Sequence, residues 1–409
     1  MIASPRAALA RALDVLEGAA DVVRERVSDE RAPSWADGRG WTEALDRLSD
    51  RELQACEEQG LCRVAPDLPG MPASLVDLAL AVTAATELPS LDTDDREPPL
   101  RTGVGARKRH QLAALLDAIA PMAAHKRRVV DIGAGKGHFS RAASEALAKE
   151  VLGLDRDPAR VRAAIDLSAP DGRATFLRLD VFSEALPLGP DDLAVGLHAC
   201  GEVGDRTAAA AAEAGSDLAL VSCCLQKIQG DLRPPLSLAA RARGAELPRQ
   251  ILGLSNLTAR AAGVERSLSE TNRAREHRLA LRLLLRSRGA LVDHGEELRG
   301  INRRRALAGL EGIAERALEM RGLRPATAGE LARAAEEAKL RFARMRRWNL
   351  PRSMLSRLIE VTVSLDRAAI LEEHGLAAAV MTLVDPSVTA RNIIVLASRD
   401  PARLPRSRP

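Results

Sequence analysis

The feature that most constrains the fold is a short apolar run followed at once by three glycines at alternate positions. Residues Val129 to Ile132 are largely β-branched and predict a short buried strand. Gly133, Gly135 and Gly137 come next, and they allow backbone conformations and ligand approaches that a Cβ would block. Residues 139–149 are rich in Ala, Leu and Glu and predict a helix. Strand, glycine turn and helix are the nucleotide-binding opening of a doubly wound α/β sheet.

The third glycine narrows the choice of nucleotide. A dinucleotide loop has the spacing Gly-x-Gly-x-x-Gly, whereas this loop ends its alternate glycines at Gly137 and has His138 next. The run Asp131-Ile-Gly-Ala-Gly-Lys-Gly137 resembles motif I of class I S-adenosylmethionine-dependent methyltransferases. The resemblance implies that Asp131 helps to hold the methionine ammonium group, and that the glycines, His138 and the more distant His198 lie against the cofactor.

Acidic residues also end the next two predicted strands. Asp155 follows the apolar run 151–154, about 20 residues beyond the glycines, where a carboxylate can accept from both ribose hydroxyls. Asp180 follows the predicted strand 174–179, and the resemblance places this residue near the adenine amino group. A single acidic residue here is usually a cap or turn residue, but Asp131, Asp155 and Asp180 together favour a cofactor site.

The rest of the chain is organised around this core. Its 409 residues are enough for two or three domains. We expect a Rossmann-like α/β fold, a seven-stranded class I methyltransferase sheet of order 3-2-1-4-5-7-6. Its later strands are predicted at 193–197, 217–222, 376–384 and 392–397. The expected domains are a helical N-terminal domain and linker (1–100), a methyltransferase domain (101–398) with a helical insertion at about 290–360, and a disordered tail (399–409).

Composition excludes several classes of protein. No segment approaches the roughly 20 apolar residues of a membrane span, and the early charges of the N-terminus do not fit a secretory signal. Five cysteines without regular spacing predict reduced thiols in a cytoplasmic protein. The chain has no Tyr and four Phe, which argues against a broad aromatic platform for bases. The sequence does not set the oligomeric state.

The predicted fourth and fifth strands end in chemically active residues. His198-Ala-Cys200-Gly201 follows the fourth strand, and Cys223-Cys224 follows the fifth. Because parallel neighbouring strands end at one edge of a sheet, these side chains are expected to meet at the crevice.

These motifs together resemble one methyltransferase family. It includes proteins described as ribosomal RNA adenine dimethylase domain-containing, within a clan that also holds tRNA acceptor-stem 2′-O-ribose methyltransferases. Further segments that resemble this family are 41–62, 107–111, 365–373 and 385–393. The resemblance implies S-adenosylmethionine as cofactor and chemistry after the fourth strand.

One departure from the pattern bears on the acceptor. Adenine N6 methylases carry Asn-(Pro, Ile or Leu)-Pro-aromatic after the fourth strand, and this chain has His198-Ala-Cys200-Gly201 there. The near match Asn349-Leu-Pro-Arg352 lies far downstream and lacks the aromatic residue. Adenine dimethylation is therefore disfavoured.

Four interpretations of the strand-end cluster remain open. Cys200 or Cys223 could be a thiolate nucleophile, as in RNA cytosine-5 methylases, although the proline that usually precedes that cysteine is missing. His198 could be a general base for an oxygen or nitrogen acceptor. A zinc site is a third interpretation, disfavoured because the adjacent Cys223 and Cys224 would both have to bind one ion. Small thiols that fill space beside the cofactor are the fourth. We favour His198, and no metal is expected.

Basic segments suggest an RNA partner. The stretch 107–111, which contains Lys108 and His110, could line the substrate mouth or be a solvated turn. The helices 273–288 and 341–352 are rich in arginine, and Arg347 and Trp348 could contact phosphate and base. A solvated arginine face explains the same pattern, and the net charge of +4 is mild.

The sequence therefore predicts an S-adenosylmethionine-dependent methyltransferase with an RNA acceptor, tRNA or rRNA. The alternatives are a protein or small-molecule acceptor, a non-catalytic scaffold that binds the cofactor, and a nucleotide-dependent oxidoreductase.

Overall fold

A computed structural model describes residues 4–92, 106–168, 172–197, 199–257, 267–293, 295–386 and 388–407. The predicted base His198 lies outside the described residues. The chain divides into two compact units, each made of separate stretches of sequence. The first comprises residues 1–20, 81–262 and 355–409, and the second comprises 21–80 and 263–354.

This division differs from the predicted boundary at residue 100. Helix α1 (Pro5–Gly18) belongs to the first unit, where the Ser4 hydroxyl donates to the Glu372 carboxylate at 3.0 Å. Residues 21–80 belong instead with the insertion, since Glu57 pairs with Arg346 at 2.7 Å. Local sequence patterns do not reveal such pairs, because their partners lie several hundred residues apart in the chain.

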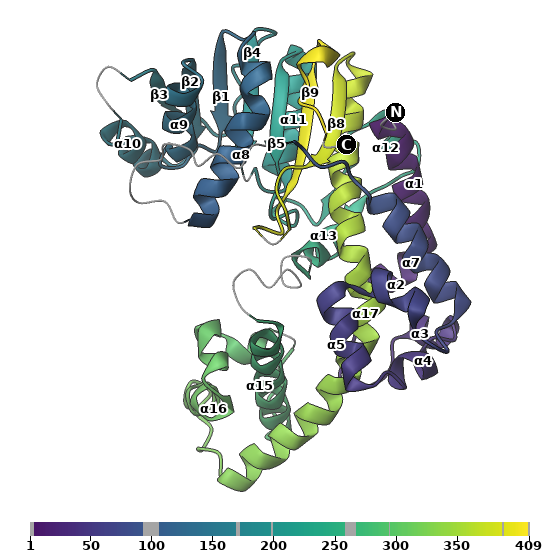
Figure 1. Ribbon diagram of the computed structural model, residues 1–409. Coiled ribbons are helices and arrows are strands. Elements are labelled where there is room, and N and C mark those ends of the chain that lie inside the picture. Colours follow the sequence, from purple (N-terminus) through teal and green to yellow (C-terminus); the bar gives the residue numbers. More distant parts are fainter. Residues whose placement is uncertain are drawn as a thin grey trace. The chain divides into compact units, whose positions relative to one another are not determined.

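The first unit contains the predicted seven-stranded sheet, in the order β3-β2-β1-β4-β5-β9-β8 (Figure 1). With β8 and β9 counted as the sixth and seventh strands, this is the predicted order, and the fold class is confirmed. The strands β1 to β5 pair in parallel, and β9 runs antiparallel to both β5 and β8. The strands are β1 (Arg128–Ile132), β2 (Glu150–Asp155), β3 (Ala174–Arg178), β4 (Asp192–Leu197), β5 (Asp217–Val221), β8 (Ala377–Thr382) and β9 (Ile393–Ser398).

Alternate residues of a strand point to opposite faces of the sheet, and the apolar residues on a face pack against helices. On one face, Leu115 and Ile119 of α8 and Phe139 of α9 share a buried cluster with Val129 and Val195. Further helices of this unit are α8 (Ala106–Ala123), α9 (His138–Ala146), α10 (Pro158–Asp166), α11 (Glu202–Ala214), α12 (Leu238–Arg241), α13 (Arg249–Leu252) and the 3₁₀ turn η2 (Gly253–Ser255). A small ribbon of β6 (Leu232–Arg233) and β7 (Leu247–Pro248) follows β5 along the chain.

The second unit is helical in its described part. Its elements are α2 (Ala20–Arg24), α3 (Ser34–Gly38), α4 (Thr42–Asp46), α5 (Asp50–Gln59), α6 (Leu61–Val64), η1 (Ala65–Asp67), α15 (Leu268–Ser287), η3 (Glu296–Leu298), η4 (Arg303–Leu307) and α16 (Leu310–Glu319). Three elements have residues in both units: α2 through Ala20, α7 (Ala73–Thr86) and the long helix α17 (Ala328–Glu373). Ser49 and Glu52 form a capping box at the start of α5.

The predicted disordered tail is instead folded through residue 407. Pro401–Arg403 forms the 3₁₀ turn η5, and Leu91 and Ser407 form a β-bridge. The Asp92 N–H donates to the Arg406 carbonyl at 3.2 Å, so backbone pairing orders a segment whose composition suggested disorder. Among the described residues, no helix is long and apolar enough to cross a membrane.

Candidate active site

The parallel strands β1 to β5 all end at one edge of the sheet, so the segments that follow them gather there. The order places β1 between β2 and β4, which is the point where the chain reverses its direction across the sheet. Ligands of open α/β sheets bind in the crevice at such a point.

The glycine loop between β1 and α9 borders open space. Gly133 and Gly135 have φ of 80° and 59°, and a Cβ built on either would have no neighbour within 4 Å. Gly137 differs, because a Cβ there would lie 2.5 Å from the ring of Phe176 on β3. The first two glycines therefore face free volume, whereas the third makes room for an aromatic ring.

The predicted cofactor residue His138 is the first residue of α9, after a left-handed cap at Gly137. Its Nδ1 lies 3.4 Å from a guanidinium nitrogen of Arg141, which also donates to the Lys136 carbonyl at 2.8 Å. His138 is half-buried at the start of the helix, beside the loop.

Asp131 and Asp155 lie at the ends of the two strands nearest the loop. Asp131 is 2% exposed, and its carboxylate accepts a 2.5 Å hydrogen bond from the Ser140 hydroxyl. Asp155 accepts from two backbone N–H groups at 2.9 Å each, those of Gly135 and Asp157. Asp155 therefore joins the glycine loop to the end of β2.

Asp180 organises the turn after β3. Its carboxylate accepts from the Phe182 N–H at 3.1 Å, and its own N–H donates to Glu184 at 3.0 Å. The Arg206 guanidinium lies 5.1 Å from the centre of the Phe182 ring. Asp180 is half-buried, at the same sheet edge as Asp131 and Asp155.

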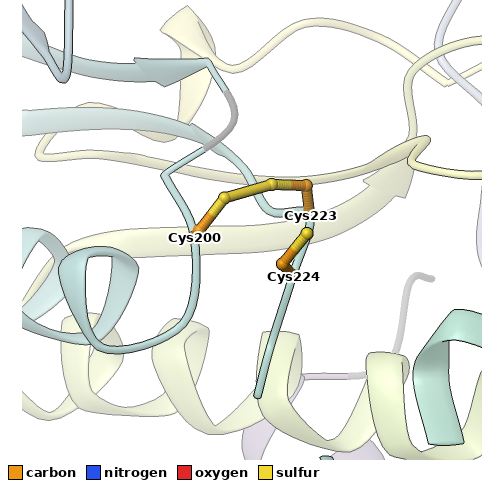
Figure 2. Close-up of side chains that lie close together, drawn as sticks. All are labelled: Cys200, Cys223 and Cys224. Carbon is orange, nitrogen blue, oxygen red and sulfur yellow. A yellow bond between two sulfur atoms is a disulfide. The ribbon is translucent and has the colours of Figure 1, made fainter. Parts of the chain in front are cut away.

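The segments after β4 and β5 meet through their cysteines. Cys200 and Cys223 form a disulfide, and Cys224 lies beside them (Figure 2). All three sulfur atoms lie within 4.8 Å of one another. The expected meeting of these thiols is therefore found, but the prediction that all cysteines are reduced is wrong for this pair. The register of β4 on β5 pairs Leu197 with Val221, which brings residues far apart in sequence to one place.

A buried charge network holds the two cysteine segments. Arg367 of α17 is fully buried and donates to the Gly201 carbonyl and the Asp205 carboxylate, at 2.8 Å each, and to the Ser222 hydroxyl. One arginine thus links the residue after Cys200 to the residue before Cys223.

A second arginine completes this network. Arg233 binds Asp205 through two hydrogen bonds, of 2.9 and 3.0 Å, and Asp366 at 2.8 Å. Burial alone would raise the pKa of Asp205, but Arg233 and Arg367 hold that pKa below its ordinary value. The two arginines and two carboxylates balance in charge, as buried charges require.

The start of α8 and the β8–β9 connection lie at the same edge. Gln111 is 3% exposed and donates to the Arg391 carbonyl at 3.3 Å. The Arg391 side chain binds Glu360 and, at 2.8 Å, the side-chain oxygen of Asn256. His110 is exposed, and nothing is described of the Lys108 side chain.

The predicted RNA-contact residues of α17 are engaged inside the second unit. Trp348 is 4% exposed, and its indole N–H donates to Asp46 at 2.8 Å. The prediction that Trp348 is free to stack on a base is therefore wrong. Arg347 donates to the Leu48 carbonyl at 2.8 Å and to Asp50 at 2.9 Å, so its guanidinium fastens α17 to the segment that ends α4 and begins α5.

Other arginines of the two basic helices also have partners within this unit. Arg282, Arg286 and Arg341 lie 3.7, 3.8 and 3.3 Å from the carboxylate of Asp29. Further pairs are Arg278 with Glu297 at 2.6 Å and Arg288 with Glu330 at 2.7 Å. Many arginines of these two helices thus form ion pairs with carboxylates of the same unit.

Sequence reasoning missed Phe176, Ser140 and the network around Arg367. Asp366, Arg367 and Arg391 lie within the segments 365–373 and 385–393 that resemble the methyltransferase family. Charged residues inside otherwise apolar runs were the sequence signal that could have indicated this buried network. Spacing alone could not show that Arg367 binds the residues beside both cysteines.

A family model matches the part of the chain around the glycine loop. Residues 107–231 match a family model described as a methyltransferase domain. This span contains the glycine loop, the three acidic strand ends and both cysteine segments. This part of the chain is therefore similar to a methyltransferase domain, and it has a Rossmann-like fold. No curated protein matches the chain.

Solved structures with partial similarity are methyltransferases by description. An S-adenosylmethionine dependent enzyme from Mesorhizobium loti is 31% identical, over 29% of this chain and 54% of that one, with a TM-score of 0.24. A magnesium protoporphyrin IX methyltransferase from Synechocystis PCC 6803, with bound SAH, is 19% identical over 29% and 61%, with a TM-score of 0.23. A putative RNA methyltransferase from Pyrococcus horikoshii is 20% identical over 37% and 73%, with a TM-score of 0.24. The chain spans less than two thirds of the first two.

Proposed function

We propose that the protein is an S-adenosylmethionine-dependent methyltransferase, with its donor site at the carboxyl edge of β1, β2 and β3. The observation that carries this proposal is the open space beside Gly133 and Gly135, next to the carboxylate of Asp155. A methyltransferase domain match over the same residues supports it.

The residues of this edge fit the chemical groups of the cofactor. Each oxygen of Asp155 accepts one backbone N–H, and a carboxylate has about four acceptor positions, so both can also accept from a ribose diol. Asp180 can accept from the adenine amino group, and Asp131, positioned by Ser140, carries the charge that a methionine ammonium group needs. Gly133, Gly135 and His138 would line the nucleoside. The cofactor would supply a methyl group bound to a positively charged sulfur.

Catalysis would rest mainly on positioning the acceptor in line with that methyl group. His198 directly follows Leu197, the last residue of β4, and we assign it the role of general base for an oxygen or nitrogen acceptor. A thiolate nucleophile at Cys200 or Cys223 would first require their disulfide to be reduced.

RNA, tRNA or rRNA, is the acceptor that we propose, on the basis of the sequence resemblance. Most arginines named for this role pair with carboxylates in the fold, so we assign phosphate contact to the exposed Arg273 of α15 and Arg344 of α17. The exposed His110 and its neighbour Lys108 at the start of α8 are the proposed substrate contacts at the sheet edge.

Methyl transfer from radiolabelled S-adenosylmethionine to fractionated RNA, protein and small molecules tests this function. Label in RNA that ribonuclease removes would support the proposal, and label in another fraction would reassign the acceptor. Cofactor binding without transfer to any fraction would favour a scaffold. Tighter binding of NADH than of S-adenosylmethionine would overturn the donor assignment.

A further inference from the structure

The three cysteines at the sheet edge differ from Cys56 in their surroundings. Cys200, Cys223 and Cys224 are all half-buried, and they follow two adjacent strands (Figure 2). Cys56, in contrast, is 2% exposed within α5 of the second unit. Burial raises the pKa of the Cys56 thiol to about 11, so at neutral pH it remains protonated and reacts poorly with oxidants.

The fold does not depend on the disulfide to hold the two segments together. Parallel pairing joins β4 to β5 from Leu193 to Leu197. Beyond the strands, Arg367 binds both the Gly201 carbonyl and the Ser222 hydroxyl, and the Glu202 N–H donates to the Lys227 carbonyl at 3.0 Å. The segments would therefore stay close in the reduced protein, where the thiols remain in position to bond again.

The position of the bond connects it with methyl transfer. Asp131 and Val195 are paired neighbours on β1 and β4, so the glycine loop and the Cys200 segment leave the same edge of adjacent strands. An acceptor placed beside the proposed donor at that edge would lie close to these segments. The bond links the two segments and consumes two thiols, yet it leaves Asp131, Asp155 and Asp180 untouched.

The geometry points to a reversible thiol switch, in which the Cys200–Cys223 disulfide blocks methyl transfer and its reduction permits it. This inference rests on the proposed function and names the regulation of the same site. The switch acts on the acceptor side, because the cofactor side is built from β1, β2 and β3.

The chemistry balances with a peroxide as oxidant and a dithiol as reductant. One thiolate attacks the peroxide, the O–O bond breaks, and a sulfenic acid forms with release of water. The second thiol attacks that sulfur, the S–O bond breaks, and the disulfide forms with release of a second water. The two cysteines lose two electrons and two protons in total. A dithiol reverses the change by two exchange steps and leaves as its own disulfide.

The experiment compares the full-length protein in its oxidised and reduced forms. Protein is treated with hydrogen peroxide or dithiothreitol, remaining thiols are alkylated, and peptide mass spectrometry locates the bond. Binding of S-adenosylmethionine is measured by calorimetry, and transfer is measured on the accepting fraction. We expect cofactor affinity to agree within about twofold between the two forms. Transfer should fall by about tenfold or more on oxidation and return with dithiothreitol.

A Cys56→Ser/Cys62→Ser double variant is the matched control, because it keeps the three edge cysteines. It should respond to oxidation as the wild type does. Equal transfer rates in both forms, or loss of the response in the double variant, would overturn the switch. One equivalent of zinc held by the reduced protein, with these thiols protected from alkylation, would also overturn it.

Failure of the proposed function has a different signature. A protein that binds no S-adenosylmethionine in either form would refute the methyltransferase assignment. The same mass spectra would still decide whether Cys200 and Cys223 are a reversible redox pair.

Discussion

The backbone N–H of Gly135 donates a 2.9 Å hydrogen bond to Oδ2 of Asp155. This contact joins the glycine loop after β1 to the end of β2, and the other carboxylate oxygen accepts from the Asp157 N–H at 2.9 Å. Asp155 therefore has two tasks in the proposed site, since it shapes the loop and presents the oxygens that would accept from a ribose.

Replacement of Asp155 by Ala should weaken binding of S-adenosylmethionine by roughly 2 kcal/mol, or about 30-fold, through the loss of charge-assisted hydrogen bonds. Calorimetry measures the affinity, and circular dichroism confirms the fold. Asp157→Ala is the control, because Asp157 caps α10 through the Ala159 N–H and should cost about 1 kcal/mol of stability while leaving affinity intact. Unchanged affinity in Asp155→Ala would refute the assignment.

Gly137→Ala should destabilise the protein more than Gly135→Ala. Both glycines have positive φ, which costs an alanine about 1–2 kcal/mol. Only at Gly137 would the new Cβ lie 2.5 Å from the Phe176 ring, which adds an overpacking cost of about 1–3 kcal/mol. Urea unfolding of both variants measures the difference, and Phe176→Leu should relieve part of it. Equal losses would mean that the Phe176 contact does not limit this position.

Acid should destabilise the buried network around Asp205. Because Arg233 and Arg367 hold the pKa of Asp205 below its ordinary value of 3.8, its contribution is present above that pH. The contribution is lost as the pH falls through the lower, folded-state pKa. Urea unfolding at a series of pH values below about 5 gives the free energy of unfolding as a function of pH. This free energy should fall less steeply with decreasing pH in Asp205→Asn than in the wild type. Glu213→Gln, on the exposed face of α11, should keep the wild-type slope.

If RNA is the acceptor, the exposed arginines and the paired arginines should behave differently. Arg344→Gln should weaken RNA binding with little effect on stability. It should also lower, by about one, the slope of the logarithm of the binding constant against the logarithm of salt concentration. Arg346→Gln should instead lower the urea midpoint, because it breaks the 2.7 Å pair with Glu57. Filter binding at several salt concentrations makes the measurement. A salt slope that Arg344→Gln leaves unchanged would argue against phosphate contact there.

His198→Ala should lower the transfer rate by about 10²–10⁴ if His198 is the base. In the wild type, activity should then rise with pH through the imidazole pKa, because the neutral ring accepts the proton. A covalent RNA–protein adduct on denaturing gels would instead identify Cys200 or Cys223 as a nucleophile. Full activity in His198→Ala would remove the base assignment.

Local patterns in the sequence were enough to predict the sheet. The apolar runs that end at Asp131, Asp155 and Asp180 each correspond to a strand of the structure, and the strand order followed from the family resemblance. Strand and turn preferences are set by neighbouring residues, so they can be read along the chain. The domain organisation could not be predicted along the chain, because residues 21–80 form one compact unit with residues 263–354.

The side-chain partners of the site were decided only by the tertiary structure. The sequence indicated that Cys200 and Cys223 follow neighbouring strands, but not that they bond. The β4–β5 register brings the two segments together, and Arg367 binds the residues beside both cysteines. Trp348 appears in the sequence as an aromatic residue within a basic run, whereas in the fold it is buried and bonded to Asp46. Composition reports which groups a chain carries, and only long-range packing determines which of them face one another, which are neutralised and which remain at the surface.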